Sequence, residues 1–159
     1  MNKTALIQQI VARLHESFAL LERAARASQA EATHESSKAD NKYDTRGLEA
    51  SYLARGQARQ AEEILEAIQL YEALPLRDFA PGERIGLSAL VNVEAGGVRS
   101  AYFMGPASGG LEVEWQGETI TVITPPSPMG RNLMGKQAGQ HWTVKQGAAT
   151  VKFHARAVS

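Results

Sequence analysis

The chain has 159 residues, 43% of them hydrophobic and 21% charged, which is ordinary for a globular protein and excludes wholesale disorder. Lysine plus arginine and aspartate plus glutamate number 17 each, so the chain lacks the net positive charge of a stand-alone duplex-DNA binder. The absence of cysteine excludes disulfides, thiolate zinc sites and cysteine nucleophiles, and the absence of a long apolar run predicts a cytoplasmic protein with no membrane partner.

A long amphipathic helix is predicted over residues 4–32. No glycine precedes Gly47 and no proline precedes Pro75, so nothing in this segment breaks a helix. Its apolar residues recur at spacings of three and four, the period of one helix face. These residues are Leu6, Ile10, Leu14, Phe18, Leu21 and Ala25.

A second helix is predicted over residues 40–74, and Gly47 and Gly56 are points where it could bend. Its expected apolar stripe consists of Leu48, Tyr52, Ala58, Ala61, Leu65, Ile68 and Tyr71. Each helix alone would leave its stripe in water, so the two stripes should pair. The polar stretch around residues 36–41 is where the chain would reverse. We therefore expect an antiparallel coiled-coil hairpin within a monomer.

The pattern changes after the second helix, because Pro75 ends it and Pro81-Gly82 reads as a turn. Short strand-like segments separated by turn residues follow, which predicts an antiparallel sheet. The expected strands are 85–93, 98–104, 111–115, 119–123, 141–145 and 150–155. The sequence thus predicts an α+β protein with a helical hairpin at 1–75, a linker at 76–83 and a β-rich domain at 84–159.

One short helix should interrupt the strands. Ser127 is a favoured N-cap residue and Pro128 is favoured in the first turn, while Gly135 lies near the expected helix end. We expect Leu133 to point inward and Arg131 to point outward. Four histidines are spread over the chain without the spacing of a metal site.

The segment from Thr124 to Val158 resembles the end of Gre-type transcript-elongation factors. There, a Ser-Pro, a short helix with an arginine, an aliphatic pair, Gly-Lys, a turn and two final strands follow in this order. The matching residues here are Ser127, Pro128, Arg131, Leu133, Gly135, Lys136, Gly139 and Gly147. Leu133-Met134 stands where the family has its aliphatic pair.

The resemblance implies an FKBP-like C-terminal domain that docks on bacterial RNA polymerase near the mouth of its secondary channel. The docking residues it implies are Ser127, Pro128, Arg131, Leu133 and Lys136. It also implies that the hairpin enters the channel, with its tip directed at the catalytic Mg²⁺ of the polymerase and near the RNA 3′ end or DNA. The protein would carry no cofactor of its own and would share only that Mg²⁺.

The expected hairpin tip departs from the family pattern. Cleavage-stimulating members carry an Asp, two further residues and then Glu-Asn, and the two carboxylates help to hold a second Mg²⁺. If Glu35 replaces the Asp, Lys38 stands where the second acid is needed. If Asp40-Asn41 replaces the Glu-Asn pair, Ser37 stands where the first acid is needed. Either alignment loses one carboxylate.

The remaining acids leave a reduced magnesium site open. A pair such as Asp40 and Asp44 would lie on one face if the helix starts that early, and Mg²⁺ usually takes one or two carboxylates. We therefore expect a regulator that is not itself an enzyme and stimulates RNA cleavage by the polymerase weakly or not at all. Two alternatives stay open at this point: a coiled-coil adaptor that does not bind polymerase, and an FKBP-like prolyl isomerase.

Overall fold

The computed structural model describes residues 2–33 and 46–159. Its helices are α1 Lys3–Thr33, α2 Arg46–Glu72 and α3 Pro128–Leu133. Its strands are β1 Leu90–Ala95, β2 Val98–Met104, β3 Glu112–Trp115, β4 Glu118–Ile123, β5 His141–Gln146 and β6 Ala149–Val158. The chain divides into two compact units, one formed by Val11–Gln69 and the other by Met1–Ile10 together with Leu70–Ser159. The predicted boundaries at residues 75 and 84 stay a prediction.

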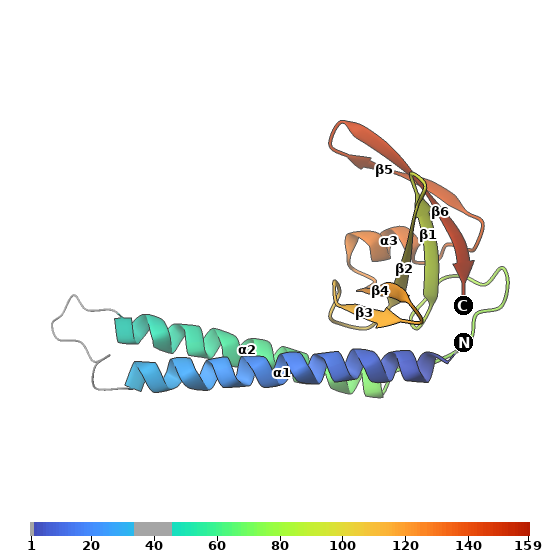
Figure 1. Ribbon diagram of the computed structural model, residues 1–159. Coiled ribbons are helices and arrows are strands. Elements are labelled where there is room, and N and C mark those ends of the chain that lie inside the picture. Colours follow the sequence, from blue (N-terminus) through green and yellow to red (C-terminus); the bar gives the residue numbers. More distant parts are fainter. Residues whose placement is uncertain (1, 34–45) are drawn as a thin grey trace. The chain divides into compact units, whose positions relative to one another are not determined.

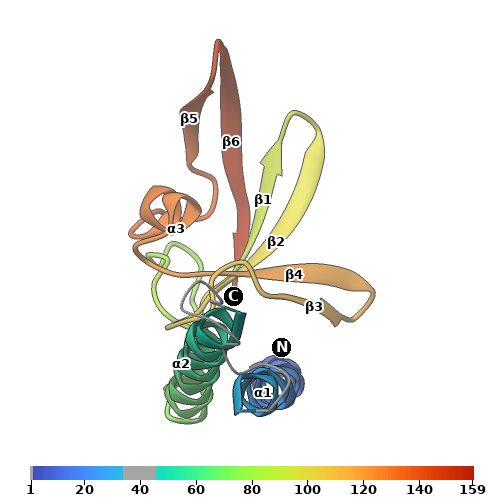
Figure 2. The same ribbon diagram turned by 90° about the vertical axis from the view of Figure 1, so that its left-hand side faces the viewer.

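The two long helices form an antiparallel pair within one chain, as Figures 1 and 2 show. Leu14 on α1 and Ala61 on α2 are buried, at 3% and 6% exposure. Farther along the pair, the Ser28 hydroxyl donates a hydrogen bond to Oε1 of Gln57 at 3.1 Å. The predicted intramolecular hairpin is therefore confirmed, while the predicted reversal at 36–41 lies outside the described residues.

The apolar stripe of α2 differs from the predicted one. Tyr52 and Leu65 were placed on it, but they are 60% and 42% exposed. The buried side chains are those of Ala61, Ala67, Ile68 and Tyr71. Successive helix residues are about 100° apart, so at Leu65 the helix has turned past the face that buries Ala61 and Ile68.

The six strands form one sheet in the order β3-β4-β2-β1-β6-β5. Five of the six strands have neighbours in the expected antiparallel sense, but β2 and β4 are parallel, with Ala101 opposite Ile120 and Met104 opposite Ile123. The exception follows from the chain path: β3 lies at the sheet edge, and β4 returns antiparallel to it between β3 and β2. The α+β fold with one short helix is confirmed, and its sheet is mixed rather than wholly antiparallel.

The first strand begins later than predicted, at Leu90 instead of Ile85. The segment before it is buried but irregular. The amide of Ile85 donates to the Lys136 carbonyl at 2.7 Å, and Ser88 adopts a left-handed backbone with φ 66°. Burial therefore produced an apolar run that reads like a strand although the backbone bends through it.

A hydrophobic core lies on the face of the sheet that α3 covers. Its fully or nearly fully buried members come from the loop before β1, from four strands and from α3. They are Phe79, Ile85, Ala89, Val91, Val93, Met104, Ile123, Leu133 and Phe153. Within the described residues, no helix is long and apolar enough to cross a membrane.

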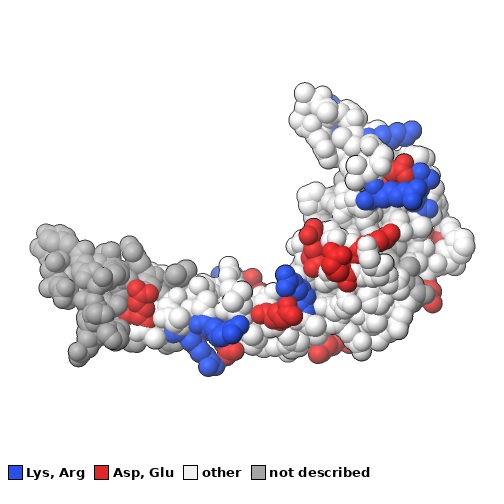
Figure 3. Space-filling model, viewed as in Figure 1, with Lys and Arg blue, Asp and Glu red and all other residues white. Residues whose placement is uncertain are grey.

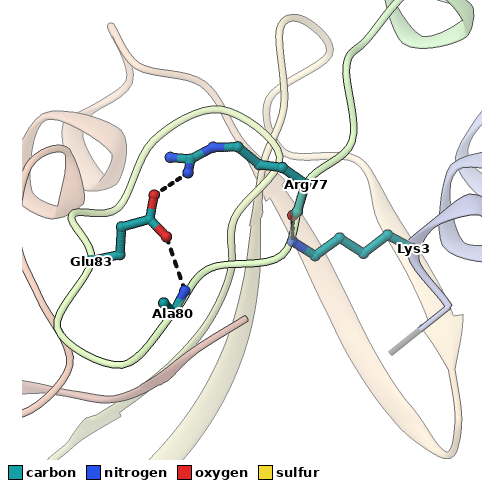
Figure 4. Close-up of polar contacts among 4 residues, drawn as sticks. All are labelled: Lys3, Arg77, Ala80 and Glu83. Carbon is teal, nitrogen blue, oxygen red and sulfur yellow. Dashed lines mark hydrogen bonds and ion pairs between the residues drawn. The ribbon is translucent and has the colours of Figure 1, made fainter.

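The loop after α2 is fastened by polar contacts, drawn in Figure 4. Arg77 forms an ion pair with Glu83, whose other carboxylate oxygen accepts from the Ala80 amide at 2.9 Å. The Nζ atom of Lys3 donates to the Arg77 carbonyl at 2.5 Å and lies 4.8 Å from the centre of the Phe79 ring. Burial lowers the pKa of Lys3, and the negative charge of Asp78 opposes that effect.

Candidate functional site

The segment from Ser127 to Lys136 begins with a capped helix. The Ser127 hydroxyl accepts a hydrogen bond from the Gly130 amide at 3.0 Å and donates one to the Thr124 carbonyl at 2.7 Å. Pro128 occupies the first turn, where its missing amide hydrogen costs nothing. The predicted cap and first-turn proline are confirmed, and they fix where α3 starts.

Gly130 lets α3 pack directly against the preceding backbone. A Cβ atom at this position would collide with the carbonyl group of Thr124 and lie 2.9 Å from the Ser127 hydroxyl oxygen. Any larger residue would therefore push the helix away from the loop that carries the cap. Glycine here serves close approach, because its φ is not in the left-handed region.

The two sides of α3 have different surroundings, as predicted. Leu133 is fully buried in the core, whereas Arg131 is exposed and donates from Nη1 to the Pro126 carbonyl at 2.9 Å. Pro128 is also exposed, and Met134, the second residue of the predicted aliphatic pair, is 40% exposed. Arg131, Pro128 and Met134 are thus available to a partner, while Leu133 and Ser127 hold the helix in place.

The turn after α3 places Lys136 beside an aromatic ring. Gly135, with φ 77°, donates its amide hydrogen to the Ile85 carbonyl at 2.9 Å, and its own carbonyl accepts from Arg84 at 3.1 Å. The Nζ atom of Lys136 then lies 5.4 Å from the centre of the Trp142 ring, within reach of a cation–π interaction. The structure thus brings Lys136 and Arg131 onto one short segment with fixed ends.

The predicted tip residues cannot be placed in this way. Glu35, Asp40, Asn41 and Asp44 lie outside the described residues. Within residues 2–33 and 46–159, no group of three or more histidine, aspartate or glutamate side chains is arranged to hold a metal ion. The expectation of a shared Mg²⁺ at Asp40 and Asp44 therefore stays a prediction.

The sheet domain separates its charges, as Figure 3 shows with acidic side chains gathered in one place and basic ones in another. Glu94 on β1 accepts from Nε of Arg156 at 2.8 Å and lies 3.6 Å from Nε of Arg99. The hydrogen bond from Arg156 lowers the pKa of Glu94. By contrast, none of the ion pairs found in the described residues involves Glu112, Glu114 or Glu118 of the β3–β4 hairpin.

Sequence analysis missed a pair of histidines that the hairpin of β5 and β6 brings together. His141 and His154 are directly opposite in the register, and their rings stack with centres 4.0 Å apart and planes 13° apart. Gln146 pairs with Ala149, so the turn has two residues, and it opens with Gly147 at φ 62°. Counting outward from a two-residue turn would have predicted that His141 faces His154.

A polar groove of about 590 Å³ lies where the outer parts of β2 and β4 diverge. Figure 2 shows the β1–β2 and β3–β4 hairpins separating there. The side chains that line it include Asn92, Arg99, Tyr102, Glu118 and Arg156. Tyr102 is its one aromatic residue, so the groove is unlike a deep aromatic-lined pocket.

Comparison with known proteins gave similar solved structures only. No protein-family model matches the chain, and no curated protein matches it. It is similar to Gfh1 of Thermus aquaticus, with 24% identity, a TM-score of 0.38, and coverage of 95% of this chain and 92% of that one. For the GreA factor homolog 1 of Thermus thermophilus the values are 22%, 0.38, 98% and 93%.

The chain is also similar to the transcription elongation factor GreA/GreB from Nitrosomonas europaea, with 13% identity and a TM-score of 0.35. That likeness covers 70% of this chain and 92% of that one. These structures are Gre-type factors and Gre homologues, the group that the segment 124–158 resembles. At these identities and TM-scores the likeness describes the chain without assigning it a role, so function has to come from its own residues.

Proposed function

We propose that this chain binds the core of bacterial RNA polymerase at the secondary channel and modulates transcription there during initiation, elongation or backtracking. The C-terminal domain docks through Pro128, Arg131 and Lys136, and the hairpin tip is directed at the catalytic Mg²⁺. Ser127 and Leu133 contribute by positioning α3. The chain carries out no chemistry of its own, and its effect on RNA cleavage is weak or absent.

The observation that carries this proposal is the local structure of the segment 127–136. Its capped helix, inward leucine, outward arginine and Gly-Lys turn reproduce the features expected from the resemblance, in the same order. Two exposed cations and an exposed methionine on a rigid segment form a compact contact surface. A docking residue must be held in place to be specific, and the hydrogen bonds of Ser127 and Gly135 hold this one.

The hairpin supplies reach. A helix of 31 residues, the length of α1, is about 45 Å long at a rise of about 1.5 Å per residue. Two such helices that bury their apolar faces against each other can present a polar exterior to a water-filled pore. A rod of this kind would carry a few side chains to a deep active centre without a globular domain having to enter.

The tip sets the proposed limit on activity. Asp40 and Asp44, with Glu35 and Asn41 nearby in sequence, offer oxygen ligands of the kind that Mg²⁺ prefers. However, Lys38 or Ser37 occupies the position where a second conserved-type acid would be needed for efficient cleavage. One remaining carboxylate can approach the metal of the polymerase yet orient water poorly.

Neither alternative function gains support from a specific observation. A prolyl isomerase would require an aromatic-lined pocket, whereas the groove beside β2 is lined by charged and polar side chains and Tyr102. An adaptor that dimerises through its N-terminal helix would use a face that α2 already covers, since Leu14 and Ala61 are buried in a single chain.

Retention of core RNA polymerase by the immobilised protein tests the docking surface. We expect the wild type to retain polymerase and the double variant Arg131→Gln/Lys136→Gln to lose most of that retention. Arg99→Gln, which removes an exposed positive charge from β2 of the same domain, is the matched control and should retain polymerase. If wild-type protein retains none, the proposed function fails.

A cleavage assay on stalled, backtracked transcription complexes tests the tip. The wild type should cleave far more slowly than a standard Gre factor at equal occupancy. Asp40→Ala and Asp44→Ala should reduce whatever cleavage remains without affecting polymerase retention. Brisk wild-type cleavage that both substitutions abolish would show that the tip has a complete metal site after all.

A further inference from the structure

Positive charge is concentrated at the end of the sequence, although the whole chain is neutral. From Thr119 to Ser159 there is no aspartate or glutamate. The same stretch contains five basic residues: Arg131, Lys136, Lys145, Lys152 and Arg156. Three of them lie on the β5–β6 hairpin, so this part of the sheet domain has a positive field that the net charge conceals.

The register of the hairpin puts most of this charge on one face. Thr143 is opposite Lys152 and Lys145 is opposite Thr150, while His141 is opposite His154. Directly opposite residues share a face, and residues two apart on a strand do as well. Lys145, Lys152, His141 and His154 are therefore side by side, and all but the half-buried His154 are exposed.

The other face of the hairpin is committed to the fold. Trp142 stacks on Phe153 with ring centres 5.5 Å apart, and both pack with Val144 against the core beneath α3. The basic face consequently has a rigid backing. Its side chains can meet a ligand without any rearrangement of the sheet.

The histidine stack ends at an open edge. β5 is the last strand of the sheet, and its far side has no neighbouring strand. One ring face of His141 is against His154, and the other is directed beyond that edge. A flat aromatic group could continue the stack there. Burial and the nearby charges of His154, Lys152 and Arg156 lower the pKa of His141, so its ring is neutral at pH 7.

The single carboxylate on this face is already neutralised. Glu94 pairs with His154 across the β1–β6 ladder, but it accepts hydrogen bonds from Arg156 and lies within 3.6 Å of Arg99. It therefore does not cancel the charge of Lys145 and Lys152, which have no ion-pair partner among those found in the described residues.

We infer that the outer face of the β5–β6 hairpin, formed by His141, Lys145, Lys152 and His154, binds single-stranded RNA. A base stacks on the open ring face of His141, and the two lysines neutralise backbone phosphates. Single-stranded nucleic acid is recognised by this combination of stacking rings and flanking cations on a sheet. An acidic protein surface would use the lysines but would gain nothing from an exposed ring stack.

The test is fluorescence anisotropy of full-length protein with a labelled single-stranded RNA of about 20 nucleotides, longer than the roughly 4–16 nucleotides that such surfaces cover. His141→Ala should weaken binding at least about fivefold, because stacking of one base is lost. His141→Phe should bind as well as the wild type, since phenylalanine keeps the stacking ring. Lys145→Gln/Lys152→Gln should lower the steepness of the salt dependence by roughly 1.4, about 0.7 per phosphate contact.

Arg13→Gln/Arg23→Gln is the matched control, because it removes two exposed charges from α1, and it should leave RNA affinity unchanged. The inference is overturned if the wild type does not bind RNA at low salt, or if this control loses as much affinity as the lysine variant. It is also overturned if His141→Ala binds like the wild type while polyglutamate competes as well as unlabelled RNA, which would indicate an acidic protein partner. Polymerase is absent from the assay, so the result is independent of the proposed function.

Discussion

The Tyr71 hydroxyl at the end of α2 donates a hydrogen bond to the Ala107 carbonyl, 2.8 Å away in the loop between β2 and β3. The ring is 1% exposed, and burial raises the pKa of its hydroxyl group far above the usual value. A Cβ atom at Gly105 would fall on this hydroxyl and lie 3.1 Å from a Val122 methyl group. Glycine at 105 is thus the residue that leaves room for Tyr71.

Gly105→Ala should therefore destabilise the protein by overpacking, on the order of 1–3 kcal/mol in the free energy of unfolding. Tyr71→Phe removes only the hydroxyl group and its hydrogen bond, and should cost about 0.5–1.5 kcal/mol. Urea unfolding followed by circular dichroism measures both. In the double variant Gly105→Ala/Tyr71→Phe, the costs should sum to less than the two single values, because the atom that clashes has gone. Strict additivity would contradict the contact.

Two glycines in helices should respond in opposite ways to alanine. At Gly130 in α3, a Cβ atom would collide with the Thr124 carbonyl group, so Gly130→Ala should destabilise by about 1–3 kcal/mol. At Gly56 in α2, nothing lies within 4 Å of the added atom, so Gly56→Ala should stabilise by about 0.5–1 kcal/mol. Thermal unfolding of the two variants compares them directly. A fall in stability for both would mean that α2 is closely covered at Gly56.

The helices were the most predictable part of the fold. The bounds of α1 differ by one residue from the predicted 4–32, because its apolar period continues without a breaker. The stripe of α2 was harder, since small alanines such as Ala61 and Ala67 fill the seam while the larger Leu65 and Tyr52 are exposed. Size misleads where two helices approach closely and only small side chains fit between them.

The sheet shows a different limit. Alternation and turn residues located all six strands, but strand order is a non-local property, and nothing in the sequence of β4 indicates that it runs parallel to β2. For the candidate site, Ser127, Arg131 and Leu133 could be assigned because capping and helix faces are local. The stack of His141 on His154 required the length of a turn, which composition around Gly147 leaves undetermined.

His141 should titrate below the usual range for histidine in the folded protein. Loss of hydration lowers its pKa first, and the charges of His154, Lys152 and Arg156 lower it further, with Glu94 across the sheet bound to Arg156. Because the folded state then binds the proton less readily than the unfolded chain, lowering the pH through about 6.5 should weaken folding at this residue. NMR titration of the ring protons measures the pKa. In His154→Gln it should shift upward, and an unchanged value would show that the stack is not formed in solution.

The last prediction separates positioning from contact in α3. Ser127→Ala removes the cap on the Gly130 amide and the donor to the Thr124 carbonyl, which should cost about 1 kcal/mol and loosen the helix. Polymerase retention should fall in step with stability, and Ser127→Thr, which keeps a hydroxyl group, should restore both. Arg131→Gln should behave differently: the exposed guanidinium makes one hydrogen bond to the Pro126 carbonyl, so stability should change by less than about 0.5 kcal/mol.

Retention of polymerase by Arg131→Gln should nevertheless be lost, because the charge itself meets the partner. Calorimetric unfolding and the retention assay, run on the same preparations, place each variant on two axes. Ser127→Ala should move along both axes together, whereas Arg131→Gln should move along the retention axis alone. If Arg131→Gln unfolds as early as Ser127→Ala, or if it retains polymerase fully, Arg131 belongs to the scaffold of α3 and the docking contact has to be sought at Pro128 and Lys136.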